Sequence, residues 1–341
     1  MLGASDLHIK SGARPRLRIN GRILDLEGSR VLSGSEVREL LVEVLSKNQR
    51  ELFESAEEQD LSYGTEEMGR FRCNFFCDSN GPAGSFRRIP PEVPSLYELD
   101  LPPVAETLAD LHSGLVLVTG ATGSGKSTTL AAIIDLINER HSRSIVTLED
   151  PVEYMHDSKS SIVHQRGLHT DIVDFASGIR AALRQNPDIL LVGEMRDLET
   201  MRLALSAVET GFLVFATLHT NSAASSIDRI IDVFPVDEQP QARSILASSL
   251  AAVMCQVLLP RIDREGQVPA TEVLIATPAI SNLIREGKMK DVPTQIQTGK
   301  QHGMHTLDDS LEKLFKEHKI DGPTAFAHCT NQARFEKLGI C

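Results

Sequence analysis

The sequence contains no tryptophan, few aromatic side chains of any kind and no long apolar run. A helix that crosses a bilayer needs about 20 mostly apolar residues, and no segment approaches that length. The first ten residues, MLGASDLHIK, lack the basic region and the apolar stretch of a secretory signal. We therefore expect a cytoplasmic protein that does not span a membrane.

Cysteines are few, and basic residues are fewer than acidic ones. The five cysteines (73, 77, 255, 329 and 341) are scattered, and Cys73 with Cys77 has no second pair at zinc-finger spacing, so we expect reduced thiols. Lysine and arginine number 35 against 47 acidic residues, a formal net charge of -12. Such a chain has no general attraction for nucleic acid or for an anionic membrane. Nucleic acid is excluded as a default partner, and any membrane association should run through a protein.

At 341 residues the chain exceeds the ~250 to 300 residues at which one core stops growing, so we expect two domains. Five prolines between residues 90 and 103 predict a semi-rigid linker. Before it, Asn20-Gly21 predicts a tight hairpin turn, and Ser33 with Glu36 predicts a capping box at the start of a helix. Residues 70–76 and 84–89 read as strands. The first part of the chain is therefore predicted to be a small α+β domain.

Beyond the linker, short apolar segments alternate with helical ones. The strand-like segments end near residues 119, 149, 192 and 218. This alternation predicts a parallel sheet flanked by helices, with ligands bound at the carboxyl ends of the strands. From about Pro269 the chain reads as mainly helical, with one apolar stripe over residues 305–320.

A phosphate-binding loop, GATGSGKST, directly follows the first of these strands and precedes a helix, as its mechanism requires. It comprises Gly120, Ala121, Thr122, Gly123, Ser124, Gly125, Lys126, Ser127 and Thr128. The glycines let peptide N–H groups wrap around phosphates, Lys126 would contact the β- and γ-phosphates, and Ser127 would ligate Mg²⁺. The sequence therefore predicts ATP and Mg²⁺ as cofactors.

Acidic and imidazole side chains follow three further strands. Glu194 ends DILLVGE in the layout of a Walker B element and is the best candidate to orient or deprotonate water. Either Glu149 or Glu153, in EDPVEY, is placed to reach the same water, and His219 in ATLHTN is placed to sense the γ-phosphate or bridge subunits. Taken alone, such an acid more often marks a solvated strand end and such a histidine a structural residue, but the phosphate loop favours the functional interpretation.

Four blocks, GATGSGKST, TLEDPVEY, RQNPDILLVGEMRD and ATLHTN, occur in that order. They resemble the Walker A motif, Asp box, Walker B motif and His box of the type II/IV secretion and pilus-motor ATPase family. The resemblance runs from residue 3 to about residue 315. It includes AISNLIRE at 279–286, which is similar to a signature of the pilus-retraction branch.

The resemblance implies an α/β fold with four parts. These are an N-terminal PAS-like α+β domain (1–90), a Pro-rich linker (91–104), a RecA-like P-loop ATPase core (105–268) and a helical C-terminal region (269–341).

The resemblance also implies roles for individual residues. Glu153, Glu194 and His219 match the functional residues of their boxes, which leaves Glu149 and Asp150 as secondary candidates. Arg72 and Arg87 match first-domain arginines that approach the γ-phosphate. Arg196 is a weaker candidate for a sensor of nucleotide state. The partner-facing candidates lie in the signature: Ala279, Ile280, Asn282, Leu283, Ile284, Arg285 and Glu286. Ser281 stands where the family has arginine, which we expect to weaken a contact there without affecting hydrolysis.

The function implied is a hexameric cytoplasmic ATPase motor that powers type IV pilus retraction and twitching motility. Its expected partners are further copies of itself, an inner-membrane platform protein of the pilus machine and a second retraction ATPase. The same boxes would suit an accessory retraction ATPase or a type II secretion or pilus assembly ATPase. The chain lacks the four-cysteine zinc site and long N-terminal extension of the assembly ATPases, which favours retraction.

Two interpretations from other classes stay open. A RecA-like ATPase acting on nucleic acid would need a basic binding face, which the acidic balance disfavours. A non-catalytic, nucleotide-dependent scaffold would make Glu194 a structural residue.

Overall fold

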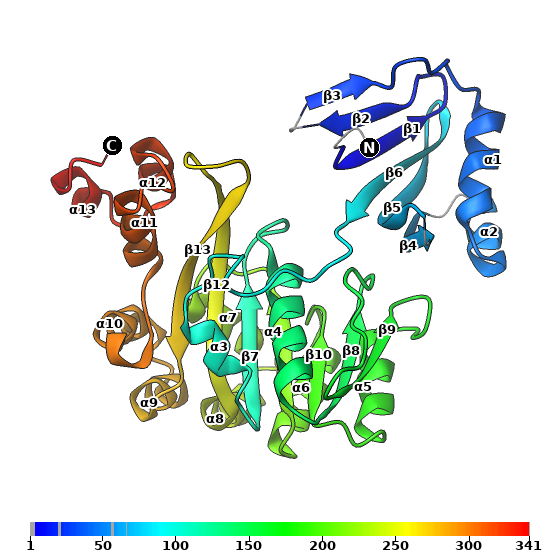
Figure 1. Cartoon of the computed structure of the whole chain (residues 1–341). Helices are drawn as coiled ribbons and strands as arrows, with labels where there is room; N and C mark the ends of the chain where they lie inside the picture. Colours follow the sequence, from blue (N-terminus) through cyan, green and yellow to red (C-terminus); the bar gives the residue numbers. More distant parts are fainter. Residues whose placement is uncertain (1–3, 20–21, 56–57, 66, 341) are drawn as a thin grey trace. The chain divides into compact units, whose positions relative to one another are not determined.

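The computed structural model describes residues 4–19, 22–55, 58–65 and 67–340, and its contacts divide the chain into two compact units (Figure 1). Unit 1 comprises Met1–Glu92 with Pro151–Met155, and unit 2 comprises Val93–Asp150 with His156–Cys341. Among the described residues, no helix combines the length and apolar character needed to cross a membrane.

Unit 1 is built on an antiparallel sheet with the strand order β3-β2-β1-β6-β5-β4. Its strands are β1 (Asp6–Lys10), β2 (Arg16–Ile19), β3 (Arg22–Asp25), β4 (Gln59–Thr65), β5 (Gly69–Asp78) and β6 (Gly81–Ile89). Helices α1 (Gly34–Val44) and α2 (Lys47–Glu54) supply apolar side chains to the same core as β4 and β5. The ring of Phe75 in β5 lies at the centre of this core, with Phe53 and Phe86 against it.

The local predictions for unit 1 are confirmed where the structure describes them. Ser33 caps α1 and forms the capping box with Glu36. The predicted hairpin strands pair antiparallel as β2 and β3, and Ile19 lies opposite Arg22. The predicted turn itself, Asn20-Gly21, lies outside the described residues. The two predicted strands at 70–76 and 84–89 are β5 and β6, which pair antiparallel.

Unit 2 contains a mostly parallel sheet with the strand order β13-β12-β7-β11-β10-β8-β9, in which only β13 runs antiparallel to its neighbour. Its strands are β7 (Gly114–Thr119), β8 (Ser144–Glu149), β9 (Ile162–Gly167), β10 (Ile189–Val192), β11 (Leu213–Leu218), β12 (Leu250–Pro260) and β13 (Gln267–Ile275). The central strands β7, β10 and β11 are buried along their whole length. This is expected for strands that are covered by helices on both faces.

Two groups of helices cover the sheet of unit 2. Helices α3 (Val104–Leu108) and α4 (Lys126–Arg140) form one core with the sheet. Helices α5 (Phe175–Leu183), α6 (Leu198–Glu209), α7 (Ala223–Asp232), α8 (Gln239–Ser249), α9 (Pro278–Glu286) and α10 (Val292–Thr298) form another. The mixed α/β architecture predicted from the sequence is confirmed.

The helical end of the chain begins later than predicted. Strand β13 runs across the expected boundary at residue 268, because it pairs along its length with β12. The helical part therefore starts with α9 and continues through two short 3₁₀ turns (Met289–Asp291 and Lys300–His302), α10, α11 (Leu307–Lys316), α12 (Gly322–His328) and α13 (Gln332–Lys337). Helices α11 to α13 pack on the far ends of β12 and β13.

Most of the proline-containing segment is packed on unit 2. Leu96 is buried in the core that contains α3 and α4. Asp100, in a left-handed conformation, forms ion pairs with Arg261, with Arg264 at 3.0 Å and with Lys319 at 2.8 Å. The segment is thus fixed to the end of the β12–β13 hairpin and to the residues after α11.

Candidate nucleotide site

The phosphate-binding loop connects β7 to α4 in a conformation that needs glycine. Gly120, Gly123 and Gly125 have φ values of 141°, 80° and 88°, which side chains rarely allow. A Cβ atom at Gly120 would lie 2.3 Å from the backbone oxygen of Gln256. The loop therefore keeps its peptide groups free of side chains, as a cradle for phosphate requires.

Gln256 in β12 supports the loop from within the core. Its side-chain Nε2 donates to the backbone oxygen of Ser124 at 2.6 Å, and its Oε1 accepts from Thr129 Oγ1 at 3.0 Å. The side chain is only 2% exposed. Sequence reasoning missed this residue, and its one signal was a glutamine inside an otherwise apolar stretch.

Lys126 at the start of α4 folds back on the loop. Its Nζ donates to the backbone oxygens of Gly120 at 2.8 Å and Ala121 at 3.0 Å. Burial lowers the pKa of this ammonium below its ordinary value and outweighs the raising effect of Glu194. Ser127 follows in the same turn of α4 and is exposed. A glycine cradle, an ammonium and an accessible hydroxyl together fit a nucleotide phosphate with Mg²⁺.

The sheet order brings the other predicted side chains to the same edge. Strands β7, β11, β10 and β8 are consecutive neighbours and run parallel, so their carboxyl ends meet. These ends carry the phosphate loop, His219, Glu194 and Glu149 respectively. The prediction that these residues share one edge is thus met by the topology.

Glu194 is held as an ionised carboxylate. His219 Nε2 lies 3.2 Å from one carboxylate oxygen of Glu194, and Arg196 lies 2.7 Å from the other. Burial by itself would raise the pKa of Glu194, but the hydrogen bonds and charges of Arg196 and His219 outweigh it, so the pKa lies below its ordinary value. An ionised carboxylate beside a phosphate loop can orient water and accept its proton.

Backbone contacts fix the turn that presents Glu194. The N–H of Gly193 donates to the backbone oxygen of Leu148 at 2.7 Å, and the hydroxyl of Thr217 donates to the backbone oxygen of Gly193. The N–H of Met195 donates to the backbone oxygen of Thr217 at 3.1 Å. A Cβ at position 193 would lie 3.0 Å from the oxygen of Leu148, so glycine lets the two strand ends approach closely.

Glu149 has local partners of its own. Its Oε1 accepts from Thr147 Oγ1 at 2.6 Å and from Gln165 Nε2 at 3.2 Å. Asp150 follows it at the strand end, and its charge acts on Arg196. Glu149 is therefore engaged within the sheet.

The remaining predicted site residues belong to unit 1, where each arginine has an acidic partner. Arg72 and Arg87 lie opposite each other on β5 and β6. Arg72 NH1 lies 3.0 Å from Glu153 Oε1, and Arg87 Nε lies 2.8 Å from Asp6 Oδ1. No sequence pattern indicated the pairing of Arg72 with Glu153, which joins β5 to the segment 151–155 within unit 1.

The signature helix α9 requires a correction. Ile280 and Ile284 are both 0% exposed, because their spacing of four residues puts them on the face of α9 that packs into the core of unit 2. They cannot face a partner. Leu283 is partly buried against the same core, and the exposed members of the predicted set are Ala279, Asn282, Arg285 and Glu286.

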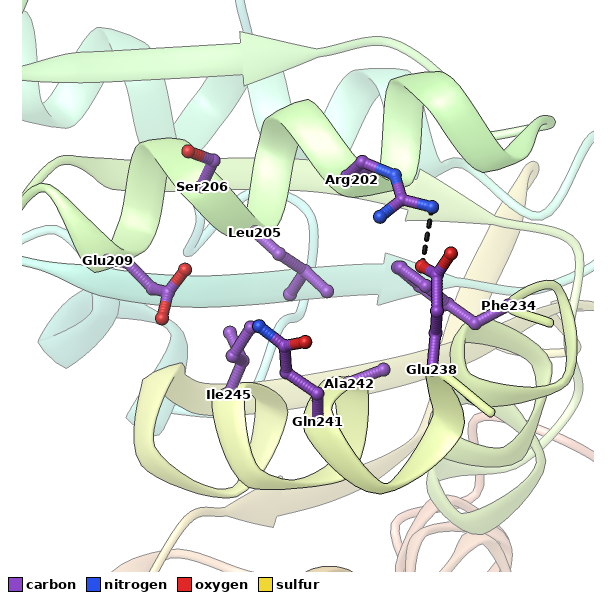
Figure 2. A pocket seen from close by; sticks show the side chains of 9 residues that line it. All are labelled: Arg202, Leu205, Ser206, Glu209, Phe234, Glu238, Gln241, Ala242 and Ile245. Carbon is purple, nitrogen blue, oxygen red and sulfur yellow. Dashed lines mark ion pairs between the residues drawn. The ribbon is translucent and has the colours of Figure 1, made fainter. Parts of the chain in front are cut away.

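A cavity of about 210 Å³ lies between α6 and α8 (Figure 2). An ion pair of 2.6 Å between Arg202 and Glu238 closes one end, and the Arg202 guanidinium lies over the ring of Phe234. No residue of the phosphate loop, and neither Glu194 nor His219, lines this cavity. It is therefore not the nucleotide site.

The strand-loop-helix cradle after β7, the glutamate after β10, two strands away, and the parallel sheet define a P-loop nucleoside triphosphatase. Residues 95–320 match the type II/IV secretion system protein family, and the chain belongs to that family. The type IV pilus retractation ATPase PilT of Pseudomonas aeruginosa is 47% identical over 312 residues, which are 92% of this chain and 90% of the relative. The type IV pilus ATPase PilU of the same species is 37% identical over 326 residues, 96% of this chain and 85% of the relative.

A solved structure agrees with these relatives. The crystal structure of the pilus retraction motor PilT with bound ADP has a TM-score of 0.91 and 43% identity to this chain. It covers 98% of this chain, and the match covers 96% of that structure.

Proposed function

We propose that this protein is an ATP-hydrolysing motor that powers type IV pilus retraction and thereby twitching motility. The observation that supports this best is the meeting of the phosphate loop, Glu194 and His219 at one sheet edge in a chain that is 47% identical to a PilT over 92% of its length.

The site residues divide the work of hydrolysis. The loop N–H groups and Lys126 bind the phosphates, and Lys126 leaves the two loop carbonyls that it now contacts. Ser127 would hold Mg²⁺, with Glu194 or Glu153 reaching the ion through water, and the ion would supply charge neutralisation at the phosphates. Glu194 orients the attacking water and accepts its proton, and His219 fixes the orientation of the carboxylate. Glu153 is the second candidate for contact with this water.

The motor function depends on the first unit. In this proposal unit 1 is a PAS-like domain, and its Arg72 and Arg87 reach the γ-phosphate when the two units close, because arginine grips phosphate oxygens in two places. Each arginine then exchanges its present carboxylate partner for phosphate. The change of unit between Glu92 and Val93 falls inside the Pro-rich linker that we propose at residues 91–104.

The assembly we propose is a ring of six copies in the cytoplasm, peripheral to the inner membrane through the pilus machine. Its partners are an inner-membrane platform protein and a second retraction ATPase. Because the chain has a net charge of -12, the docking surface on the platform protein should be basic. The exposed residues of α9, such as Arg285, are candidates for partner contact.

Gene deletion tests the function. We expect excess surface pili and lost twitching, restored by the wild-type gene but not by Glu194→Gln. Bald cells would contradict retraction and indicate an assembly ATPase. Unchanged pili and motility would contradict a principal role in retraction.

Expression in Pseudomonas aeruginosa strains that lack either PilT or PilU separates the two retraction roles. Because the identity is 47% to PilT and 37% to PilU, we expect the chain to restore twitching in the strain without PilT. Restoration only in the strain without PilU would assign it the accessory role.

A further inference from the structure

The first residues of two helices lie at one half-buried carboxylate, that of Glu272 in β13. The N–H of Ala223, the first residue of α7, donates to Glu272 Oε1 at 2.8 Å. The backbone N–H of Leu307, the first residue of α11, also acts on this carboxylate and lowers its pKa. These N–H groups have no partner within their own helices, and both helix ends favour negative charge. Glu272 therefore connects the start of α7 to β13, and the first N–H of α11 acts on the same carboxylate.

The helix α7 starts directly after the His219 loop and is tied to it by hydroxyl groups. The hydroxyls of Ser226 in α7 and Thr220, the neighbour of His219, lie 2.6 Å apart. Ser226 Oγ also donates to Thr119 Oγ1 at 3.4 Å, and Thr119 precedes the first glycine of the phosphate loop. Thr119 Oγ1 in turn donates to Cys255 Sγ at 2.9 Å, and Cys255 is the residue opposite Glu272 in the β12–β13 pair.

The other helix, α11, is attached to β13 by several contacts. Val273 and His305 exchange backbone hydrogen bonds, and the His305 ring contacts Thr271 Oγ1 at 2.8 Å. Ser310 in α11 accepts from the N–H of Thr271 at 3.0 Å. Strand β13 and α11 thus form one support, and Glu272 adds a polar connection at the start of α7 to the apolar packing of this helix on the sheet.

We propose that Glu272 is a positioning residue for ATP hydrolysis: by holding the N-terminus of α7 against β13, it sets the position of the His219 imidazole at Glu194. The proposal rests on the proposed function, because it needs His219 to act in turnover. Glu272 itself touches neither nucleotide nor water in this role.

Burial supports the assignment. It raises the pKa of Glu272, the Asp308 charge acts in the same direction, and the N–H donors of Ala223 and Leu307 oppose them. Desolvation of a carboxylate lowers the free energy of unfolding, and a neutral side chain would pack equally well at this position. The N–H groups at the starts of α7 and α11 explain why a carboxylate, and not only an apolar side chain, stands here.

The test is steady-state ATP hydrolysis by the full-length Glu272→Gln variant. Glutamine offers one oxygen and turns its NH₂ toward one of the two N–H donors, so one helix end loses its partner. We expect kcat to fall about 10- to 100-fold, with the KM for ATP and the affinity for ADP within about twofold of wild type. If this variant does not fold, Glu272→Asp keeps the charge, cannot reach both donors and should show a smaller loss of kcat.

The matched control is Asp308→Asn. Asp308 is a buried carboxylate that accepts from the N–H groups of Thr330 and Asn331 near the end of the chain. Because Asp308 follows Leu307 in α11, we expect this control to lower Tm but to lower kcat much less than Glu272→Gln does.

A double variant decides whether Glu272 acts through His219. His219→Ala should lower kcat, and adding Glu272→Gln to it should lower kcat no further. A Glu272→Gln or Glu272→Asp variant with lowered Tm but wild-type kcat would overturn the proposal, as would equal losses with and without His219. Full turnover by His219→Ala would instead overturn the role of His219 in the proposed function.

Discussion

Replacement of Gln256 by methionine removes the side-chain hydrogen bonds that support the phosphate loop, while the volume of the side chain changes little. The change leaves the backbone oxygen of Ser124 buried without a donor, which costs about 1–3 kcal/mol. Thr129 also loses its acceptor, but a threonine hydroxyl in a helix can turn to a backbone oxygen one turn earlier, so that loss is smaller. The free energy of unfolding should fall by about 2–4 kcal/mol in total.

Thermal unfolding and nucleotide titration measure the two effects of Gln256→Met. In a domain of this size, each kcal/mol of lost unfolding free energy lowers Tm by about 2–4 °C, so the Tm of the variant should be lower by about 5–15 °C. Because Ser124 lies within the loop, ADP binding should weaken about tenfold. Gln241→Met, at an exposed position on α8, is the control and should change neither quantity. A Gln256→Met variant with wild-type Tm and wild-type ADP affinity would refute the reasoning.

Two further predictions concern unit 1. Arg72→Ala should lower kcat for ATP hydrolysis while ADP binding stays largely intact. The control Arg88→Ala, at an exposed position on β6, should leave both kcat and ADP binding unchanged. Loss of binding with normal turnover of bound ATP would contradict the role of Arg72. The second prediction concerns pH. Hydrogen bonds from Arg30 and then Ser33 lower the pKa of Glu36 from 4.5 to about 2. The Glu36 carboxylate therefore stabilises the fold fully above pH 4.5, and this contribution is lost as the pH falls through about 2. Glu36→Gln should therefore lower the Tm of this unit by more at pH 7 than at pH 3. A Tm difference between variant and wild type that is the same at both pH values would contradict this prediction.

The nucleotide edge was predictable because it repeats a local pattern several times. A short apolar strand followed by a characteristic loop or acid identifies its own end, as at Gly120 and Glu194, and parallel strands place such ends together. The helix start at Ser33 was predictable for a similar reason, since a capping box is a contact between residues three apart.

Other features depend on contacts between distant residues and left little trace in the sequence. Strand β9 is short and mixed in polarity, and β12 has a glutamine in its middle, so neither shows a clear strand pattern. The partner of Arg72 is 81 positions away, and the N–H donor to Glu272 is 49 positions away. Polar residues inside strands proved to be the useful signal: Gln256 and Glu272 both support elements of the nucleotide edge.

The same argument explains the error in α9. The sequence match placed seven residues of the signature on a partner surface, but a helix that lies on a core must bury one stripe. Ile280 and Ile284 form that stripe. A sequence signature therefore combines residues that hold the helix in place with residues that are free to make contacts.

The central claim is that the carboxyl edge of the unit 2 sheet hydrolyses ATP with Glu194 acting on water. The most direct test is steady-state hydrolysis by the purified wild type and by Glu194→Gln, with ADP binding measured on the same samples. We predict hydrolysis that requires Mg²⁺ in the wild type, and a kcat lower by about 10²- to 10⁴-fold with ADP binding retained in the variant. Equal kcat values for the two proteins, or no hydrolysis by the wild type, would contradict the claim.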